Sequence, residues 1–171
     1  MELIRPTRDQ WAMELAITTS RRSTCCRRNV GCVLLNDRGH VIATGYNGVA
    51  AGLPHCNERV LEDPIDVGLL QAGMVGRKVT YPFACDGAVS PSGTDLDACH
   101  AIHAEQNALL QCKDVYSIDT AYVTASPCIA CTKLLLNTSC RRIIYRDEYP
   151  HPTARRLWTS SGRDWEQLQV P

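Results

Sequence analysis

Four side chains that can bind a metal ion or move a proton lie within seven residues of one another in the segment DACHAIHAEQNALL, residues 97–110. They are Cys99, His100, His103 and Glu105. Sulfur and imidazole nitrogen are preferred ligands of zinc, and a carboxylate can act as a general acid or base. Such a group serves one metal site, two neighbouring sites, or one site with residues beside it that do not take part.

The segment SPCIAC, residues 126–131, supplies two further candidate zinc ligands. If Ser126 caps a helix, Cys128 and Cys131 lie three residues apart on one face of its first turns. The positive end of the helix dipole favours thiolates, which are the form that binds zinc. Together with His103, these cysteines make a Cys₂His set that leaves one coordination position for water, as in catalytic zinc sites.

Glu105 is the candidate acid and base that acts on that water. Residues two apart on a regular helix point about 200° away from each other, so Glu105 is not expected to be a ligand beside His103. If His103 stands at the start of the helix, the Glu105 carboxylate can reach the water, take its proton and return it to a ring nitrogen or a leaving amine. The pattern His-x-Glu followed by Pro-Cys-x-x-Cys is the signature of zinc-dependent nucleobase deaminases.

Alternating helices and strands are predicted to position these residues. The apolar spacing predicts a helix over residues 7–20 with Thr7 as its N-cap, and Asp37-Arg38-Gly39 predicts a hairpin turn. The predicted strands are 30–36, 40–46, 120–125, 141–146 and 165–170, and the other predicted helices are 103–112, 128–138 and 153–161. This order predicts an α/β fold with one mixed sheet and helices on its faces, in a single domain spanning 1–171.

Residues 47–99 interrupt the alternation. They lack periodicity and are rich in proline and glycine, and within them only 59–75 is a candidate for a short helix. Because unstructured loops of this length are uncommon in compact domains unless they have a function, we expect an inserted irregular arm that helps to form the site.

Composition excludes several classes of function. Lys and Arg together number 18, as do Asp and Glu, and the formal net charge is therefore zero. Proteins that bind polynucleotides usually carry a basic excess, so a small-molecule substrate is expected. No apolar stretch predicts a membrane span or a signal peptide. Ten cysteines in a chain of this kind are expected to be metal ligands or buried thiols of a cytoplasmic protein rather than disulfides.

The chain resembles the deoxycytidylate deaminase family, in particular its phage and bacterial type, within the zinc-dependent cytidine deaminase-like superfamily. The blocks that carry the resemblance are RSTCCRRNVGCVL, ATGYNG, CHAIHAEQNAL, YVTASPCIACTKLLLN and RIIYRDEYP. The resemblance implies a three-layer α/β/α sandwich. It also implies hydrolytic deamination of dCMP to dUMP, with dCTP to dUTP as a further reaction, in pyrimidine deoxynucleotide synthesis.

The resemblance assigns roles to individual residues. It implies that His103, Cys128 and Cys131 hold the catalytic zinc and that Glu105 is the proton shuttle. The expected substrate-binding residues are Asn47 for the deoxyribose, Arg27 and Tyr149 for the phosphate or sugar, and Ser126. Arg27 also suits this role chemically, because guanidinium groups bind phosphate in a bidentate manner.

A second, structural zinc is expected to tether the arm. Its ligands are predicted to be Cys25, Cys56, Cys85 and Cys99, with His55, His100 and Cys26 as possible substitutes. A closed tetrahedral site of this kind can replace a missing apolar core. The resemblance further implies a homohexamer regulated by dCTP and dTTP, and Mg²⁺ would accompany a triphosphate substrate.

Two other functions remain open at this point. Another deaminase of the same fold, acting on tRNA adenosine or in the riboflavin pathway, would share the zinc motif. A non-enzymatic zinc module that binds a partner would instead saturate each zinc with four protein ligands.

Overall fold

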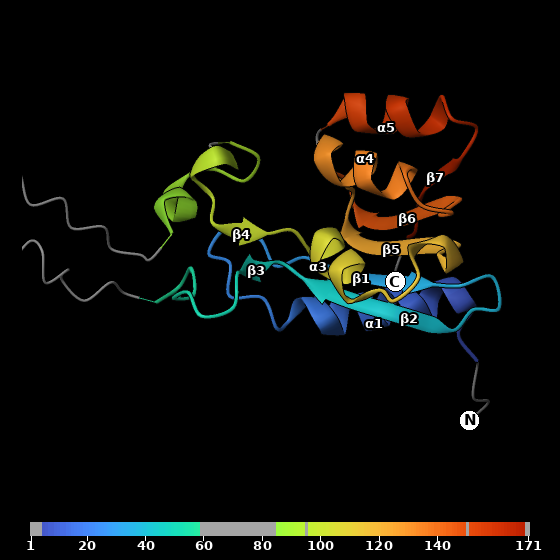
Figure 1. Cartoon of the computed structure of the whole chain (residues 1–171), viewed down its shortest axis with the longest axis horizontal. Coiled ribbons are helices and arrows are strands. Elements are labelled where there is room, and N and C mark those ends of the chain that lie inside the picture. The colour runs from blue at the N-terminus through green and yellow to red at the C-terminus, as the bar shows by residue number, and fades with distance from the viewer. Residues whose placement is uncertain (1–4, 59–84, 95, 150, 170–171) are drawn as a thin grey trace, which may run out of the picture.

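A five-stranded mixed sheet in the order β2-β1-β5-β6-β7 forms the centre of the computed structural model, which describes residues 5–58, 85–94, 96–149 and 151–169 (Figure 1). The strands are β1 (Gly31–Leu35), β2 (Val41–Tyr46), β5 (Thr120–Ala125), β6 (Arg142–Asp147) and β7 (Asp164–Gln167). β1 runs antiparallel to both β2 and β5, whereas β5, β6 and β7 are parallel. The mixed sheet confirms the predicted one, and the predicted hairpin is confirmed at Gly39, whose φ is +80°.

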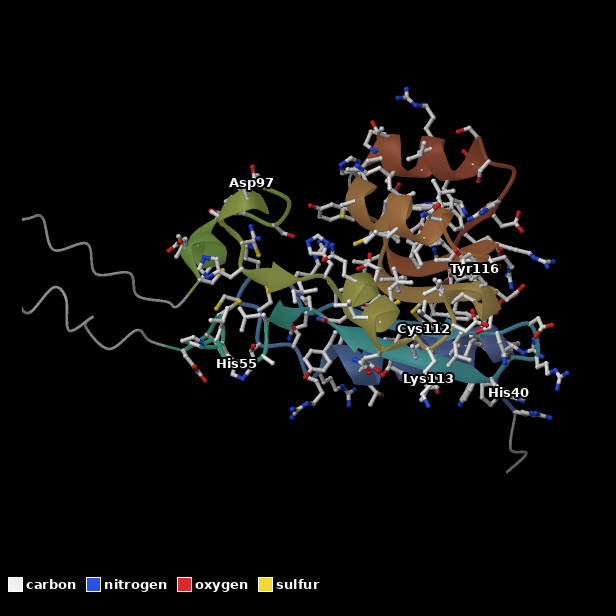
Figure 2. All side chains as sticks on the ribbon, in the orientation of Figure 1. His40, His55, Asp97, Cys112, Lys113 and Tyr116 are labelled. Atoms are coloured by element: carbon white, nitrogen blue, oxygen red, sulfur yellow. The ribbon has the colours of Figure 1, made fainter. Side chains whose placement is uncertain are left out.

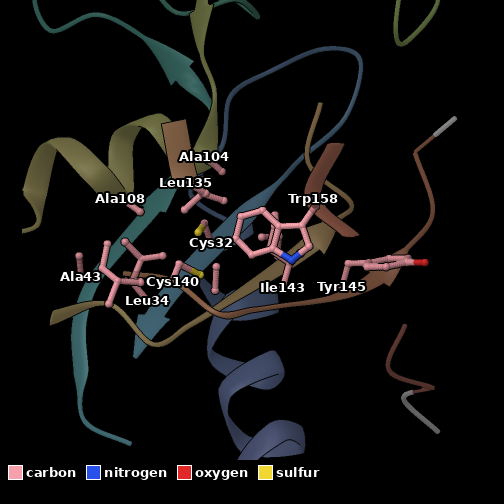
Figure 3. Close-up of a cluster of buried hydrophobic side chains, with 13 residues drawn as sticks. Cys32, Leu34, Ala43, Ala104, Ala108, Leu135, Cys140, Ile143, Tyr145 and Trp158 are labelled. Carbon is pink, nitrogen blue, oxygen red and sulfur yellow. The ribbon is translucent and has the colours of Figure 1, made fainter. Parts of the chain in front are cut away.

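Helices cover both faces of this sheet and make the three layers that were expected. α1 (Arg8–Ser20) packs on one face, and α3 (Ala104–Gln111), α4 (Ile129–Leu136) and α5 (Pro152–Thr159) pack on the other. Alternate residues of each strand point to opposite faces. Val33 of β1 accordingly packs toward α1, while Cys32 and Leu34 belong to the cluster beneath α3 to α5, which Figure 3 shows together with Trp158.

Local interactions fix where two of these helices lie. Thr7 Oγ1 accepts a hydrogen bond from Gln10 N, and Gln10 Oε1 accepts one from Thr7 N, which makes the capping box of α1 and confirms Thr7 as its N-cap. Gly45 allows β2 and α3 to approach closely, because a Cβ atom there would lie 2.2 Å from the carbonyl oxygen of Ala104.

The predicted Ser126 cap is wrong. Cys128 is the N-cap of α4, and Ser126 Oγ instead accepts a hydrogen bond from Tyr149 N at the end of β6. A hydroxyl group serves equally well as an acceptor for a helix end or for a neighbouring strand, and only the tertiary packing decides between them.

The described parts of the arm lie to one side of the core (Figure 1), next to a small antiparallel sheet that the sequence did not predict. Its strands are β3 (Gly48–Val49) and β4 (Ala101–Ile102), and two 3₁₀ turns, η1 (Asp86–Val89) and η2 (Leu96–Ala98), lie between them in the chain. The helix predicted within 59–75 falls outside the described residues. Within those residues, no helix has both the length and the apolar character of a membrane span.

Candidate active site

His103, Cys128 and Cys131 meet where the first turns of α3 and α4 come together. His103 is the N-cap of α3, and its Nδ1 atom lies 3.4 Å from Cys128 Sγ and 3.4 Å from Cys131 Sγ. A tetrahedral zinc ion with ordinary Zn–N and Zn–S bonds separates such atoms by about 3.6 Å. The three side chains therefore fit zinc, and they are the one group of its kind within the described part of the chain whose ligand atoms all lie within 4.8 Å of one another.

The electrostatics of this group favour a bound cation. A hydrogen bond from the Cys131 thiol lowers the pKa of Cys128 to about 3, helped by the hydrogen bond with His103. The hydrogen bond with Cys128, followed by burial, raises the pKa of Cys131. Without a cation the two sulfurs thus share one proton, and a divalent ion displaces that proton when it binds both as thiolates.

Glu105 lies beside this group as a buried carboxyl. Its residue is 4% exposed, and burial is the largest cause that raises its pKa to about 7. It also hydrogen-bonds with Cys131. A carboxyl group whose pKa lies near neutrality is suited to accept and return a proton in one reaction cycle.

Glu105 and His103 open into a cavity of about 90 Å³. The wall nearest the core includes Asn47, Ala125 and Ser126, and other lining residues come from the segment before β1, from the arm and from the end of β6. A cavity that combines an open metal site, a buried carboxyl group and polar walls suits the hydrolysis of a small polar molecule.

The sequence profile of the family described as cytidine and deoxycytidylate deaminase zinc-binding region matches residues 6–147. The chain belongs to this deaminase family. The match spans every element from α1 through β6, including all three candidate zinc ligands and Glu105.

Individual deaminases resemble the chain over most of its length. The deoxycytidylate deaminase of Mycobacterium phage D29 is 35% identical over 150 residues, which cover 84% of this chain and 98% of the phage protein. The deoxycytidylate deaminase of Schizosaccharomyces pombe is 35% identical over 148 residues, which cover 85% of this chain but 38% of the yeast protein. The crystal structure of dCMP deaminase from the cyanophage S-TIM5 in complex with dCMP and dUMP aligns with a TM-score of 0.67 and 27% identity, over 96% of this chain and 99% of the phage chain.

The residues that the sequence predicted for substrate binding all line the deaminase cavity. They are Asn47, Arg27, Ser126 and Tyr149. Asn47 is 8% exposed, and its amide bridges two backbone groups: Oδ1 accepts from Val30 N and Nδ2 donates to Arg28 O, each over 2.8 Å. Asn47 therefore holds the segment that precedes β1 against the end of β2, in addition to facing the cavity.

The cysteines predicted to bind a second zinc are neighbours, but no three of their sulfur atoms lie within 4.8 Å of one another. Burial and the neighbouring Cys85, which also hydrogen-bonds to it, raise the pKa of Cys56 to about 12, with smaller effects from Cys25 and Cys99. Cys56 and Cys85 are buried, and Cys25 and Cys99 also line the active-site cavity.

The possible substitutes for these cysteines have other contacts. His100 Nε2 lies 3.4 Å from Asp86 Oδ2, and the Cys26 thiol donates to the Cys56 carbonyl oxygen. His55 lies exposed on the arm, as Figure 2 shows.

Arg28, Ser92 and Gly93 are among the lining residues that the sequence did not predict. The sequence predicts Arg27 and not its neighbour Arg28, because nothing in the run RRSTCCRR, residues 21–28, distinguishes one arginine from the next. Ser92 and Gly93 lie in the aperiodic arm, where no local pattern predicts which residues approach the core.

Proposed function

We propose that this protein catalyses the zinc-dependent hydrolytic deamination of dCMP to dUMP. The observation that carries the proposal is the open Cys₂His group with the buried Glu105 beside it in a cavity lined by Asn47 and Arg28. The names of the phage and yeast relatives and the cyanophage complex with dCMP and dUMP support the same substrate.

The chain's own residues supply binding, orientation and proton transfer. His103, Cys128 and Cys131 would hold zinc, which when bound lowers the pKa of water enough to supply a nucleophile at neutral pH. Glu105 would take one proton from water and deliver it to the pyrimidine ring nitrogen N3, and would then carry the second proton from the new C4 hydroxyl group to the leaving amine. A C–O bond forms at C4 of cytosine, the C4–N bond breaks, and ammonia leaves.

Other residues that line the same cavity are proposed to bind the sugar and the phosphate. Asn47 is proposed to contact the deoxyribose, and Arg27, Tyr149 and Ser126 to contact the sugar or phosphate. Arg28 joins them, because this residue also lines the cavity and its guanidinium carbon lies 5.7 Å from the centre of the Tyr149 ring. An arginine held over an aromatic face keeps its N–H donors in one plane and so suits a phosphoryl group.

A second zinc held by Cys25, Cys56, Cys85 and Cys99 is proposed to tether the arm within a single domain of residues 1–171. The hydrogen bond between Cys56 and Cys85 and their burial support this arrangement. A closed site of four thiolates would stabilise a segment that contributes few apolar side chains to the core.

Regulation and assembly complete the proposal. We propose dCTP and dTTP as effectors, a homohexamer and a cytoplasmic location, as the resemblance of the sequence to deoxycytidylate deaminases implies. Leu110 and Tyr116 support an interface between subunits, since they are large apolar side chains that are 77% and 73% exposed near the end of α3. Figure 2 shows Tyr116 there.

A substrate panel tests the proposed reaction. Purified protein is incubated with cytosine, deoxycytidine, dCMP, dCTP, adenosine in a tRNA anticodon stem and a riboflavin-pathway pyrimidine, with and without dCTP or dTTP as effector, and ammonia is measured. Ammonia from dCMP is expected. Its absence, with ammonia from the tRNA or the riboflavin intermediate, would favour another deaminase of the same fold.

Zinc analysis of the same preparation separates the remaining alternatives. About two zinc ions per chain support the second site, whereas about one removes it. A cobalt-substituted protein whose spectrum shows four protein ligands at every metal would indicate a binding module and contradict catalysis.

A further inference from the structure

The arm contributes a turn to the active-site cavity. Ser92 and Gly93 line the same cavity as His103 and Glu105, although they come from the irregular segment rather than from the sheet or its helices. The turn is closed by the amide of Thr94, which donates to the carbonyl oxygen of Pro91. The cavity therefore has one wall that the α/β core does not supply.

A glycine allows this turn to lie against Tyr149. The φ angle of Gly93 is +92°, and a Cβ atom built there would lie 2.7 Å from Tyr149 Oη and 3.3 Å from Tyr149 Cζ. Both the backbone conformation and the space thus exclude an ordinary side chain. The turn and the Tyr149 ring face each other at close contact across the edge of the cavity.

Arg27 holds the turn in this position. Its Nη1 atom donates a 2.7 Å hydrogen bond to the carbonyl oxygen of Thr94. Arg27 is thereby engaged with the arm through one of its donors. This hydrogen bond connects the segment before β1 to the arm, and residues of both segments line the cavity.

Arg28, in contrast to Arg27, has a guanidinium donor without a partner in the described part of the chain. Its Nη1 atom is buried and has no hydrogen-bond partner among the described residues, while its guanidinium lies 5.7 Å from the centre of the Tyr149 ring. A buried guanidinium donor without an acceptor is costly unless a ligand supplies one. The two arginines therefore differ: Arg27 binds the wall, and Arg28 keeps a donor without a partner in the described structure beside the cavity.

We propose that the turn Ser92–Thr94 determines the length of the phosphate chain that the site accepts and selects a deoxycytidine monophosphate over the triphosphate. This inference rests on the proposed function. With the base at Glu105, one phosphoryl group reaches Arg28 beside Tyr149, and the turn stands where further phosphoryl groups would continue.

The charges of the residues that line the cavity also favour a monophosphate. Apart from the zinc ligand His103, the cations among the described lining residues are Arg27 and Arg28, and Arg27 is already bound to Thr94. A triphosphate brings about two more negative charges than a monophosphate, and they would find no further cation in this wall. Glu105 is the only carboxylate among these lining residues, so the cavity lacks a second one that could hold Mg²⁺ with a triphosphate.

The substitution Gly93→Ala tests the role of the turn without changing charge. Its Cβ would push the turn away from Tyr149, so the ratio of kcat/KM for dCMP to that for dCTP is expected to fall about tenfold or more, mostly through KM. Gly52→Ala is the matched control, because Gly52 is another arm glycine with positive φ, at +88°, but has nothing within 4 Å of its Cβ position. Its ratio should stay at the wild-type value.

A double variant shows whether the contact with Tyr149 causes the fall in the ratio. Tyr149→Phe removes the atom nearest to the new Cβ, so Gly93→Ala combined with Tyr149→Phe should recover most of the ratio that Tyr149→Phe shows alone. If Gly93→Ala does not fold, as judged by circular dichroism, Arg27→Met carries the test, since it releases the turn at Thr94 and should lower the ratio in the same direction.

The outcomes separate this inference from the proposed function. Wild-type protein that deaminates dCTP as efficiently as dCMP overturns the selection of monophosphate only, as does an unchanged ratio in folded Gly93→Ala. Zinc-loaded wild-type protein that releases no ammonia from either nucleotide overturns the proposed function and the inference together.

Discussion

The amide of Tyr149 donates a 2.7 Å hydrogen bond to Oγ of Ser126, so the end of β6 is fastened to the loop that leads into α4. Ser126 is two residues before Cys128, and Tyr149 forms the opposite edge of the cavity beside Arg28. One side chain thus links the metal-binding end of the site to its proposed phosphate-binding end.

Ser126→Ala is expected to destabilise the protein by about 1–3 kcal/mol, because a partly buried amide loses its acceptor. The KM for dCMP should rise as Tyr149 loses its position. Urea denaturation and steady-state kinetics measure the two effects.

Ser160→Ala is the control, since the Ser160 hydroxyl group donates to Arg156 O at the exposed end of α5. This variant should change the free energy of unfolding by no more than about 0.5 kcal/mol. Equal destabilisation by both variants would contradict the assigned role of Ser126.

Glu105→Gln is expected to lower kcat for deamination about 100-fold or more, because the amide has nearly the shape of the carboxyl group but cannot carry the proton. Zinc content and the unfolding transition should stay close to wild type, since removing a buried acid does not remove a metal ligand. Metal analysis and thermal unfolding of the same preparation provide the comparison. Retained activity would show that another group moves the proton.

Cys131→Ser is expected to lower the zinc content by about one ion per chain and to abolish deamination, because a hydroxyl group is a much weaker zinc ligand than a thiolate. Cys112→Ser offers a matched control. Cys112 lies at the end of α3 (Figure 2), where its thiol donates to Asp114 O, and a hydroxyl group can make the same bond. Loss of zinc from both variants would mean that general unfolding, rather than ligation, explains the result.

Gly45→Ala is expected to destabilise the protein by about 1–3 kcal/mol or more, because the added methyl group overlaps Ala104 O and Ala108 N of α3. Any shift of α3 moves His103 and Glu105, so zinc affinity should fall together with stability. Gly48→Ala, whose nearest neighbour is the Tyr46 ring at 3.8 Å, should have little effect. Chemical denaturation and zinc competition with a chelator distinguish the two variants, and similar values for both would disprove the close-packing argument.

Local patterns in the sequence were sufficient to predict the core elements. The apolar period of α1, the capping residue Thr7 and the turn at Gly39 act over a few residues, so they can be identified without knowing the fold. The same is true of the candidate catalytic residues, because His103 and Glu105 are two residues apart and Cys128 and Cys131 are three apart at helix starts.

Interactions between distant segments could not be predicted in this way. The small sheet that joins Gly48 to Ile102 depends on two strands of two residues each, which are too short to show a period. The role of Ser126 likewise depended on which backbone amide came within reach, and that amide belongs to a residue 23 positions later.

The sequence by itself therefore determined the α/β alternation and the candidate residues for zinc binding and proton transfer, because these follow from spacing within single helices and turns. Only the tertiary structure decided that Arg27 binds the arm at Thr94 while its neighbour Arg28 keeps a donor without a partner among the described residues, and that Gly93 brings the arm against Tyr149. The physical reason is that these contacts depend on how separate segments pack against the sheet, and no short-range pattern in the chain records that packing.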